Sequence, residues 1–249
     1  MVDFRHALVI GASSGIGEAV ARRLAAGGAR VALVARRGDR LDEIADSING
    51  AAGEQRAFAF AHDVRETSAV PELLQRITAA LGGLDLVVYA AGTQHRVAFD
   101  EFDVAKDQEM LAVNLMGAVA WLDPVAERFG RLRRGTIVGI GSVAGDRGRS
   151  ANPAYNTSKA GVHTFLEAIR NRIGRHGVRV VTVKPGFVDT AMTAGMAKTP
   201  WKISPDRAAE IIVRRARRGR ETVYVPARWR YVMWVIRATP SCVFKRLRV

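Results

Sequence analysis

The sequence has little cysteine, lysine and histidine, and it has no long uninterrupted apolar run. Cys242 is the only cysteine, which excludes a disulfide within the chain. The five histidines are scattered without the spacing of metal ligands, so we expect no metal site. No run approaches the roughly 20 apolar residues that cross a bilayer, and nothing before the first strand resembles a signal peptide. These absences favour a cytoplasmic protein.

The length and composition suit one globular domain, which we expect to span residues 1–249. With 249 residues, 48% hydrophobic and 25% charged, the chain can bury a complete core. Apolar runs alternate with helical patterns, which predicts an α/β fold with one doubly wound, seven-stranded parallel sheet flanked by helices. Strands are expected at 5–10, 31–35, 56–62, 84–89, 135–140, 178–183 and 222–225, and helices at 15–27, 39–50, 66–82, 103–129, 153–175 and 205–218.

A glycine-rich turn joins the first expected strand to the first expected helix. Such a turn lets the backbone approach a pyrophosphate and places the phosphates at a helix N-terminus, where free N–H groups favour anions. Glycines also gather in ordinary turns, so the position after the first strand is what favours a Rossmann dinucleotide site. The residues expected around the pyrophosphate are Gly11, Ser13, Ser14, Gly15, Ile16 and Gly17.

The end of the second expected strand bears on the choice of cofactor. NAD sites of this architecture hold the ribose 2′-hydroxyl with an acidic residue about 20 positions after the glycines. Here Ala35 takes that place, and Arg36 and Arg37 follow it. Their guanidinium groups suit a 2′-phosphate, which predicts NADP(H). The alternative is that two arginines of an arginine-rich chain follow the strand by accident.

Tyr155 and Lys159 form the strongest catalytic motif. At positions i and i+4 of a helix they share one face, where the ammonium can lower the pKa of the phenol. Asn152 and Pro153 precede them as a capping residue and a proline at the first helical position. The alternative for this pair alone is a surface tyrosine and lysine on an ordinary helix. Ser142, thirteen positions before the tyrosine, would complete a proton-donating site.

These motifs together resemble the classical short-chain dehydrogenase/reductase family over nearly the whole chain. The motifs occur here in that family's order: the glycine pattern, Asn114, Ser142, Tyr155, Lys159 and then Pro185-Gly186. The resemblance implies an oxidoreductase that transfers a hydride between a nicotinamide and a ketone or secondary alcohol. It implies that Tyr155 is the general acid or base, that Lys159 lowers the pKa of Tyr155 and binds the nicotinamide ribose, and that Ser142 holds the substrate oxygen.

The same resemblance implies further contacts. Asn114 would anchor a water of the proton relay, although a plain interhelical hydrogen bond is an equal alternative. Asp63 and Val64 would contact adenine, and Ala91 and Gly92 would approach the cofactor closely. The loop after the sixth strand would orient the nicotinamide through Pro185, Gly186, Val188 and Thr190. The family implies a homodimer or homotetramer through helices 103–129 and 153–175. A non-catalytic NADP-binding regulator is the alternative function, disfavoured because Asn114, Ser142, Tyr155 and Lys159 are all present.

Two variable segments bear on the substrate. Arg147 and Arg149 follow the catalytic serine, and they would either receive a phosphate or carboxylate or belong to a solvated loop. Residues 190–220 form an expected substrate lid region, of which 190–201 contains the glycine, alanines and methionines of an adaptable cover. The motifs leave the substrate open between a lipid-linked or long-chain carbonyl compound and a small soluble ketone or sugar.

The C-terminal tail, 227–249, is basic and aromatic. The chain carries a net charge of +14, and residues 202–249 hold 13 Lys and Arg against 3 acids, a net of +10. Three alternatives remain: a helix that packs on the fold or on a second subunit, peripheral contact with an anionic membrane, and nucleic-acid binding, which we do not expect because no recognition module accompanies the charge. The tail resembles that of decaprenylphosphoryl-ribose ketoreductase-type family members, which favours a lipid-linked carbonyl substrate.

Overall fold

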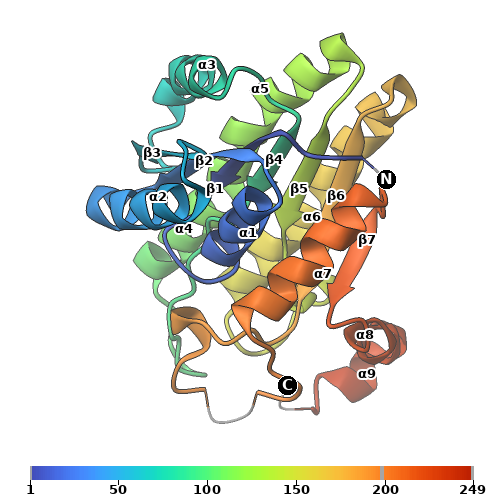
Figure 1. Ribbon diagram of the computed structural model, residues 1–249. Helices are drawn as coiled ribbons and strands as arrows, with labels where there is room; N and C mark the ends of the chain where they lie inside the picture. The colour runs from blue at the N-terminus through green and yellow to red at the C-terminus, as the bar shows by residue number, and fades with distance from the viewer. Residues whose placement is uncertain (1, 197–198, 248–249) are drawn as a thin grey trace.

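The computed structural model describes residues 2–196 and 199–247 and has a single parallel sheet at its centre (Figure 1). The strand order is β3-β2-β1-β4-β5-β6-β7, and every neighbouring pair is parallel. The predicted seven-stranded parallel sheet is therefore confirmed. The strands are β1 His6–Ile10, β2 Arg30–Ala35, β3 Ala57–Ala61, β4 Leu86–Tyr89, β5 Thr136–Ile140, β6 Arg179–Pro185 and β7 Thr222–Val225.

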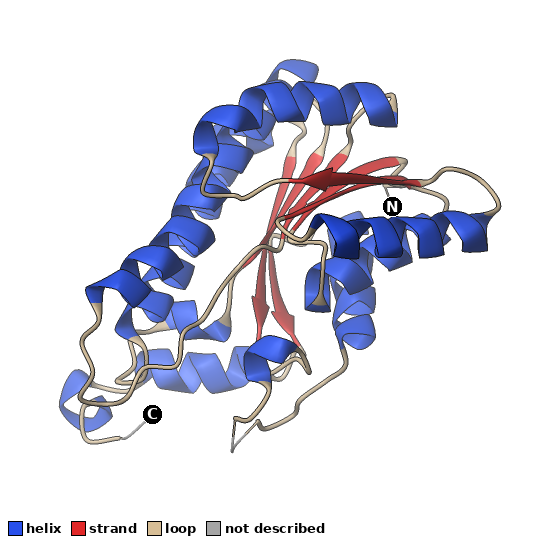
Figure 2. Ribbon diagram, turned by 90° about the vertical axis from the view of Figure 1, so that its left-hand side faces the viewer, coloured by secondary structure: helices blue, strands red, loops and turns tan. Residues whose placement is uncertain are grey.

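Helices cover both faces of this sheet, as Figure 2 shows. Helices α1, α2 and α7 pack on one face in one apolar core, and α3, α5 and α6 pack on the other face in a second core. Strands buried on both faces require continuous apolar runs, which explains why periodicity located them. The helices are α1 Gly15–Ala26, α2 Gly38–Ala52, α3 Val70–Leu81, α4 Val104–Leu111, α5 Gly117–Leu132, α6 Pro153–Ile173, α7 Pro205–Arg217, α8 Trp229–Ala238 and α9 Ser241–Phe244.

The strand order reverses between β1 and β4. The chain runs outward from β1 through β2 to β3 and then returns to β4 on the other side of β1. In such sheets the crevice beyond the carboxyl ends of these two strands is where ligands bind. The glycine turn after β1 and the segment after β4 both lie at this edge.

The expected helix at 103–129 is interrupted. A π-helical turn, Ala112–Met116, separates α4 from α5, and it contains Asn114. Such turns widen the helix locally and occur most often at functional sites. By length and composition the run Val104–Leu132 could cross a membrane, and half of its apolar 18-residue window is buried inside this fold.

The C-terminal third contains the expected lid and tail. Residues 205–217, which lie within the expected lid region 190–220, form α7, whose Ala208, Ile212 and Ala216 are buried against the sheet. The tail is folded as α8 and α9, drawn in red at the lower right of Figure 1. Residues 197–198 of the expected lid and 248–249 of the expected tail lie outside the described residues.

Candidate active site

The glycine turn is shaped by close backbone approaches. A Cβ on Gly11 would collide with the backbone nitrogen of Ala91, and one on Gly17 would collide with the Gly11 carbonyl oxygen. Gly11 and Gly15 also have positive φ angles of 87° and 58°, which favour glycine. Ser14 precedes α1 without capping it through its side chain. The first turn of α1 therefore presents N–H groups suited to phosphate oxygens.

The two arginines after β2 lie at this turn. Arg37 donates to the Ser13 carbonyl oxygen at 3.2 Å and to Ser13 Oγ at 2.9 Å. The Arg36 side chain is 56% exposed, with its Nη1 atom 3.9 Å from Asp63 Oδ2. Ala35 contributes no carboxylate that would repel a phosphate. Two guanidinium groups and one hydroxyl thus form a donor set that suits an anion beside the glycine turn.

The segments after β3 and β4 border the same crevice. Asp63 accepts a hydrogen bond from Arg65 Nη2 at 2.6 Å, and this bond holds the pKa of Asp63 below its usual value. Val64 is buried, and a Cβ on Gly117 would lie 3.1 Å from it. A Cβ on Gly92 would lie 3.3 Å from Asn114 Oδ1 and 3.4 Å from Lys159 Nζ. Gly92 therefore connects the carboxyl edge of β4 with Asn114 and Lys159.

Ser142, Tyr155 and Lys159 come together in the structure. Asn152 caps α6 by accepting the Tyr155 N–H at 3.1 Å, and Pro153 begins the helix, as predicted. The Lys159 ammonium donates to the Ile140 carbonyl oxygen at 3.1 Å and lies 5.8 Å from the centroid of the Tyr155 ring. Ser142 follows β5, and its side chain lies close enough to the Tyr155 phenol to lower the pKa of that phenol. Both Tyr155 and Lys159 are buried, so the charge of Lys159 is little screened.

The electrostatics differ from the expected arrangement in one respect. Burial raises the pKa of Tyr155, and the opposing influences are the hydrogen bond from Ser142 and the positive charge of Arg149 rather than that of Lys159. Burial also lowers the pKa of Lys159 to about 8. The Lys159 ammonium donates to the Ile140 carbonyl oxygen, and Arg149 is the cation that opposes the raised pKa of Tyr155, so the expected effect of Lys159 on the phenol stays a prediction.

Asn114 makes the interhelical hydrogen bond that was one of its two alternatives. Its Nδ2 atom donates to Ser158 Oγ and to the Thr93 carbonyl oxygen, both at 3.0 Å, and its Oδ1 atom accepts from the Thr93 N–H at 2.7 Å. Tyr89, which periodicity identified only as a strand residue, donates to the Val113 carbonyl oxygen at 2.7 Å within the π turn. The turn is thus tied to β4, to the segment after β4 and to α6.

The loop after β6 returns to the glycine turn. Thr190 lies against it, since a Cβ on Gly15 would be 3.0 Å from Thr190 Cγ2. Val188 is buried and pairs with Ile203 in an isolated parallel bridge. Pro185 ends β6, and the Gly186 N–H donates to the Val225 carbonyl oxygen at 2.9 Å. All four residues expected at the nicotinamide thus lie at the carboxyl edge of the sheet.

A buried polar network, which the sequence did not predict, contacts the backbone of Ser142 through His163. Asp146, whose side chain is 1% exposed, accepts from Lys184 at 2.5 Å and from the Tyr224 hydroxyl at 2.6 Å. His163 lies 3.6 Å from the same carboxylate, and burial is the main reason that its pKa falls to about 3. The neutral ring then accepts the Ser142 N–H at 3.4 Å. The available sequence signal for this network was Lys184, a basic residue within the otherwise mostly apolar strand β6.

Arg147 and Arg149 have different environments although they are two positions apart. Arg147 donates to the carbonyl oxygens of Ile236 and Thr239 at the end of α8, and its guanidinium carbon lies 3.9 Å from the Phe244 ring centroid. Arg149 lies near Tyr155, and its buried Nε atom has no hydrogen-bond partner among the residues that the structure describes. The expected solvated or anion-binding loop is therefore divided: Arg147 binds the tail, and the positive charge of Arg149 acts on the pKa of Tyr155.

Comparison with known proteins agrees with this geometry. The family model for short chain dehydrogenases matches residues 5–201. The chain belongs to the short-chain dehydrogenase family. It is 32% identical over 240 residues to an uncharacterized oxidoreductase of Mycobacterium tuberculosis, covering 96% of both chains. It is 34% identical to an uncharacterized oxidoreductase of Myxococcus xanthus, covering 90% of this chain and 88% of the relative.

Solved structures of family members have the same fold. A crystal structure of an actinorhodin polyketide ketoreductase variant with NADPH matches with a TM-score of 0.79 and 27% identity, covering 90% of this chain and 96% of that chain. A putative gluconate dehydrogenase from Agrobacterium tumefaciens matches with a TM-score of 0.80 and 25% identity, covering 90% and 94%. The protein is therefore an NAD(P)-dependent dehydrogenase or reductase of this family that acts on a small-molecule substrate.

Proposed function

We propose that this protein is an NADPH-dependent reductase of ketones that runs in reverse as a secondary-alcohol dehydrogenase. The observation that carries the proposal is the cluster of Ser142, Tyr155 and Lys159 at the edge of the crevice that the glycine turn borders. NADPH supplies the hydride when it is bound. The fold supplies a place for its phosphates at α1 and a proton donor for the substrate oxygen.

Each residue of the cluster has its own role in the proposed reaction. Ser142 and Tyr155 present two hydroxyl groups to the substrate oxygen, where negative charge develops during reduction. Tyr155 gives its proton to that oxygen, or removes it when the alcohol is oxidised. Lys159 and Arg149 place positive charge near the phenolate that remains. Asn114 holds Thr93 and Ser158 in position, and we propose that its π turn also anchors a water of the proton relay.

NADP(H) is the proposed cofactor because the end of β2 is cationic. Arg37 is already held at Ser13, and Arg36 extends beside it with 56% of its side chain exposed. Arginine forks bind the oxygens of a phosphate in pairs. The sequence offers no acid at Ala35 to take the 2′-hydroxyl of NAD.

Replacement of Tyr155 tests the reaction directly. We expect Tyr155→Phe to lower the turnover of NADPH with a panel of medium-chain and long-chain ketones by more than about 100-fold, the usual contribution of a general acid. NADPH binding, measured by the fluorescence of the reduced nicotinamide, should be unchanged. Tyr231→Phe is the matched control, because Tyr231 is 73% exposed on α8. Substantial turnover by Tyr155→Phe would contradict the assignment.

A non-catalytic NADP-binding regulator is the second candidate. The complete set of Asn114, Ser142, Tyr155 and Lys159 argues against it, since a regulator has no need of a buried proton donor. Tight NADPH binding without oxidation of the cofactor by any carbonyl compound would favour the regulator instead.

We propose a long-chain or lipid-linked carbonyl substrate. Large apolar side chains are exposed in the segments that follow the carboxyl ends of β4 and β6: Phe99 is 79% exposed, Phe102 92% and Trp201 45%. Arg96 joins these segments by donating to the Ala194 carbonyl oxygen at 2.8 Å. Exposed apolar surface of this kind suits an apolar partner. A small soluble ketone or sugar is the alternative, and it would give the higher kcat/KM in the same panel.

We also propose that α8 and α9 bring a cytoplasmic enzyme into peripheral contact with an anionic membrane. The inner face of α8 buries Trp229 and Met233 against Val143, whereas its outer face leaves Tyr231 73% and Trp234 72% exposed. Arg230 and Arg237 flank these aromatic side chains. Exposed aromatic residues among cations suit the interface of an anionic bilayer.

Outer-face substitutions test this contact better than truncation after Ala227, which would also remove the buried Trp229. We expect Tyr231→Ser with Trp234→Ser to reduce co-sedimentation with phosphatidylglycerol vesicles by about tenfold, because two interfacial aromatic anchors are lost. Val2→Ser is the control, because it removes exposed apolar area at a site far from α8 in the sequence. Equal sedimentation of wild type and the α8 variant would remove the membrane proposal.

A homodimer or homotetramer is the proposed assembly, through α4, α5 and α6. Val104, at the start of α4, and Met116, in the π turn, are 68% and 54% exposed, and a second subunit would cover these apolar side chains. Light scattering of the purified protein would give the subunit number, and a monomer at micromolar concentration would contradict the proposal.

A further inference from the structure

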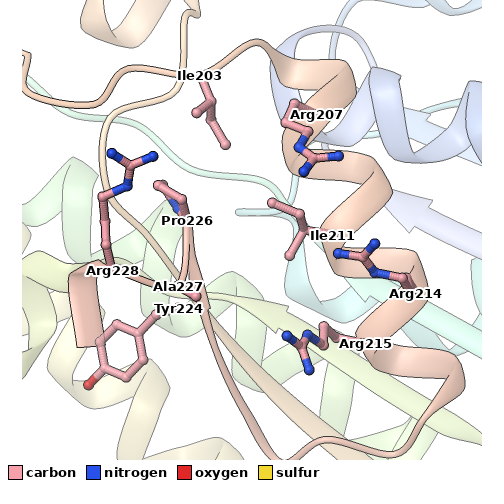
Figure 3. Close-up of a pocket in the computed structure, with 9 residues that line it drawn as sticks. All are labelled: Ile203, Arg207, Ile211, Arg214, Arg215, Tyr224, Pro226, Ala227 and Arg228. Carbon is pink, nitrogen blue, oxygen red and sulfur yellow. The ribbon is translucent and has the colours of Figure 1, made fainter. Parts of the chain in front are cut away.

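A groove of about 240 Å³ lies between α7 and the segment that leads from β7 into α8. Figure 3 shows Arg207, Arg214 and Arg215 extending from α7 toward this space, with Arg228 on the opposite wall. Between the arginines the lining is apolar and includes Ile203, Ile211 and Pro226. None of the residues assigned above to catalysis or to cofactor binding lines the groove, so it is a separate site.

The positive charge of the groove exceeds its local compensation. Glu210 pairs with Arg207 at 2.5 Å and with Arg214 at 3.5 Å. Arg228 stacks at 5.4 Å from the centroid of the Trp201 ring. Within residues 2–196 and 199–247, no carboxylate pairs with Arg215 or Arg228. Four guanidinium groups and one carboxylate leave three uncompensated positive charges, which repel one another until an anion enters.

The shape and donors suit a phosphate group. Guanidinium forks bind phosphate oxygens in pairs, and several of them can surround one phosphate. The volume lies below the roughly 300–1,000 Å³ of pockets that hold drug-sized ligands, so the groove suits a head group and not a whole amphiphile. Ile203 and Ile211 can contact the carbon atoms of a small ester that carries the phosphate.

We propose that this groove binds the phosphate of an anionic phospholipid head group. The lipid source rests on the proposed membrane contact of α8, whose exposed Tyr231 and Trp234 belong to the helix that begins immediately after Arg228. Trp201, 45% exposed and stacked under Arg228, belongs to the segment that borders the substrate crevice. A head group held here would orient that segment toward the bilayer.

The test compares two variants that each lose two positive charges. Arg214→Gln with Arg215→Gln changes the groove, and Arg131→Gln with Arg134→Gln changes the far end of α5, where Arg131 is 78% exposed. The full chain is mixed with vesicles of phosphatidylglycerol and phosphatidylcholine, and with soluble glycerol 3-phosphate in a calorimeter. NADPH binding by both variants confirms that they are folded.

We expect the groove variant to bind the vesicles about 25-fold more weakly, about fivefold for each arginine lost near an anionic surface, and the control variant to lose less than about threefold. Glycerol 3-phosphate should bind wild type and the control but not the groove variant. Equal losses by the two variants, or no binding of glycerol 3-phosphate by wild type, would overturn the phosphate site. Binding of glycerol 3-phosphate without binding of vesicles would overturn the lipid source and the membrane proposal while supporting the phosphate site.

Discussion

Two regions of the molecule meet at the carboxyl edge of the sheet, and different kinds of contact hold them in place. They are the cofactor region, residues 2–92, and the region after β6, residues 186–247. In the cofactor region the glycine turn is fixed by backbone packing: Gly11 touches Ala91, and Gly17 touches Gly11. After β6 the segments are held by side chains, such as Trp229 against Gly186 and Arg147 against the end of α8. The cofactor region therefore suits a ligand that is the same throughout the family. The region after β6 leaves an exposed surface that can differ between family members.

The largest expected effect, on both stability and NADPH binding, is in the cofactor region. Gly11→Ala should destabilise the fold by about 3–5 kcal/mol and abolish NADPH binding, because the new Cβ meets the Ala91 backbone and the residue has a positive φ angle. Gly50→Ala, within α2 and in open space, is the control and should stabilise the protein by about 0.5–1 kcal/mol. Urea unfolding measures both. Tolerance of alanine at Gly11 would show that the turn is less constrained than its packing indicates.

The next effect concerns the junction between the two regions. Asp146→Asn should lower the free energy of unfolding by about 3 kcal/mol, because Lys184 would keep a mostly buried charge without its partner. Asp189→Asn removes an exposed carboxylate paired with Lys202 and should cost less than about 1 kcal/mol. Similar losses in the two variants would mean that the network behind Ser142 contributes no more than a surface ion pair.

Cofactor preference gives an intermediate effect. Arg36→Ala with Arg37→Ala should reduce kcat/KM for NADPH by about 10- to 100-fold and change it little for NADH, because only NADPH carries the 2′-phosphate that charge-assisted hydrogen bonds would hold. Arg40→Ala is the control in α2, since Glu18 and Glu43 already pair with Arg40. An unchanged ratio of NADPH to NADH efficiency would contradict the assignment of the β2 arginines.

The sequence predicted these two regions unequally for a physical reason. Strands buried on both faces and glycines forced by contact leave periodic and compositional signals, so the seven-stranded parallel sheet, the glycine turn and the Tyr155–Lys159 pair could be predicted. Long-range side-chain contacts leave no such signal. Three features depend on which elements the fold brings together. They are the burial of Asp146 with Lys184 and Tyr224, the π turn at Asn114, and the different environments of Arg147 and Arg149. The expected lid region 190–220 includes the amphipathic helix α7, whose inner face is buried against the sheet.

The smallest expected effects come from Arg147 and Arg149. Replacing each of them gives the finest test of the difference between the two regions. Arg149→Gln removes a cation that lowers the pKa of Tyr155, so that pKa should rise. The phenolate needed for alcohol oxidation would then form only at higher pH, and the acid limb of the oxidation rate should move to higher pH. Arg147→Gln should leave this limb in place and instead speed amide hydrogen exchange in α8 by about fivefold, because the carbonyl oxygens of Ile236 and Thr239 lose a charged donor. If both variants changed both properties, the catalytic tyrosine and the C-terminal arm would be coupled through this loop, and the division between the two regions would fail there.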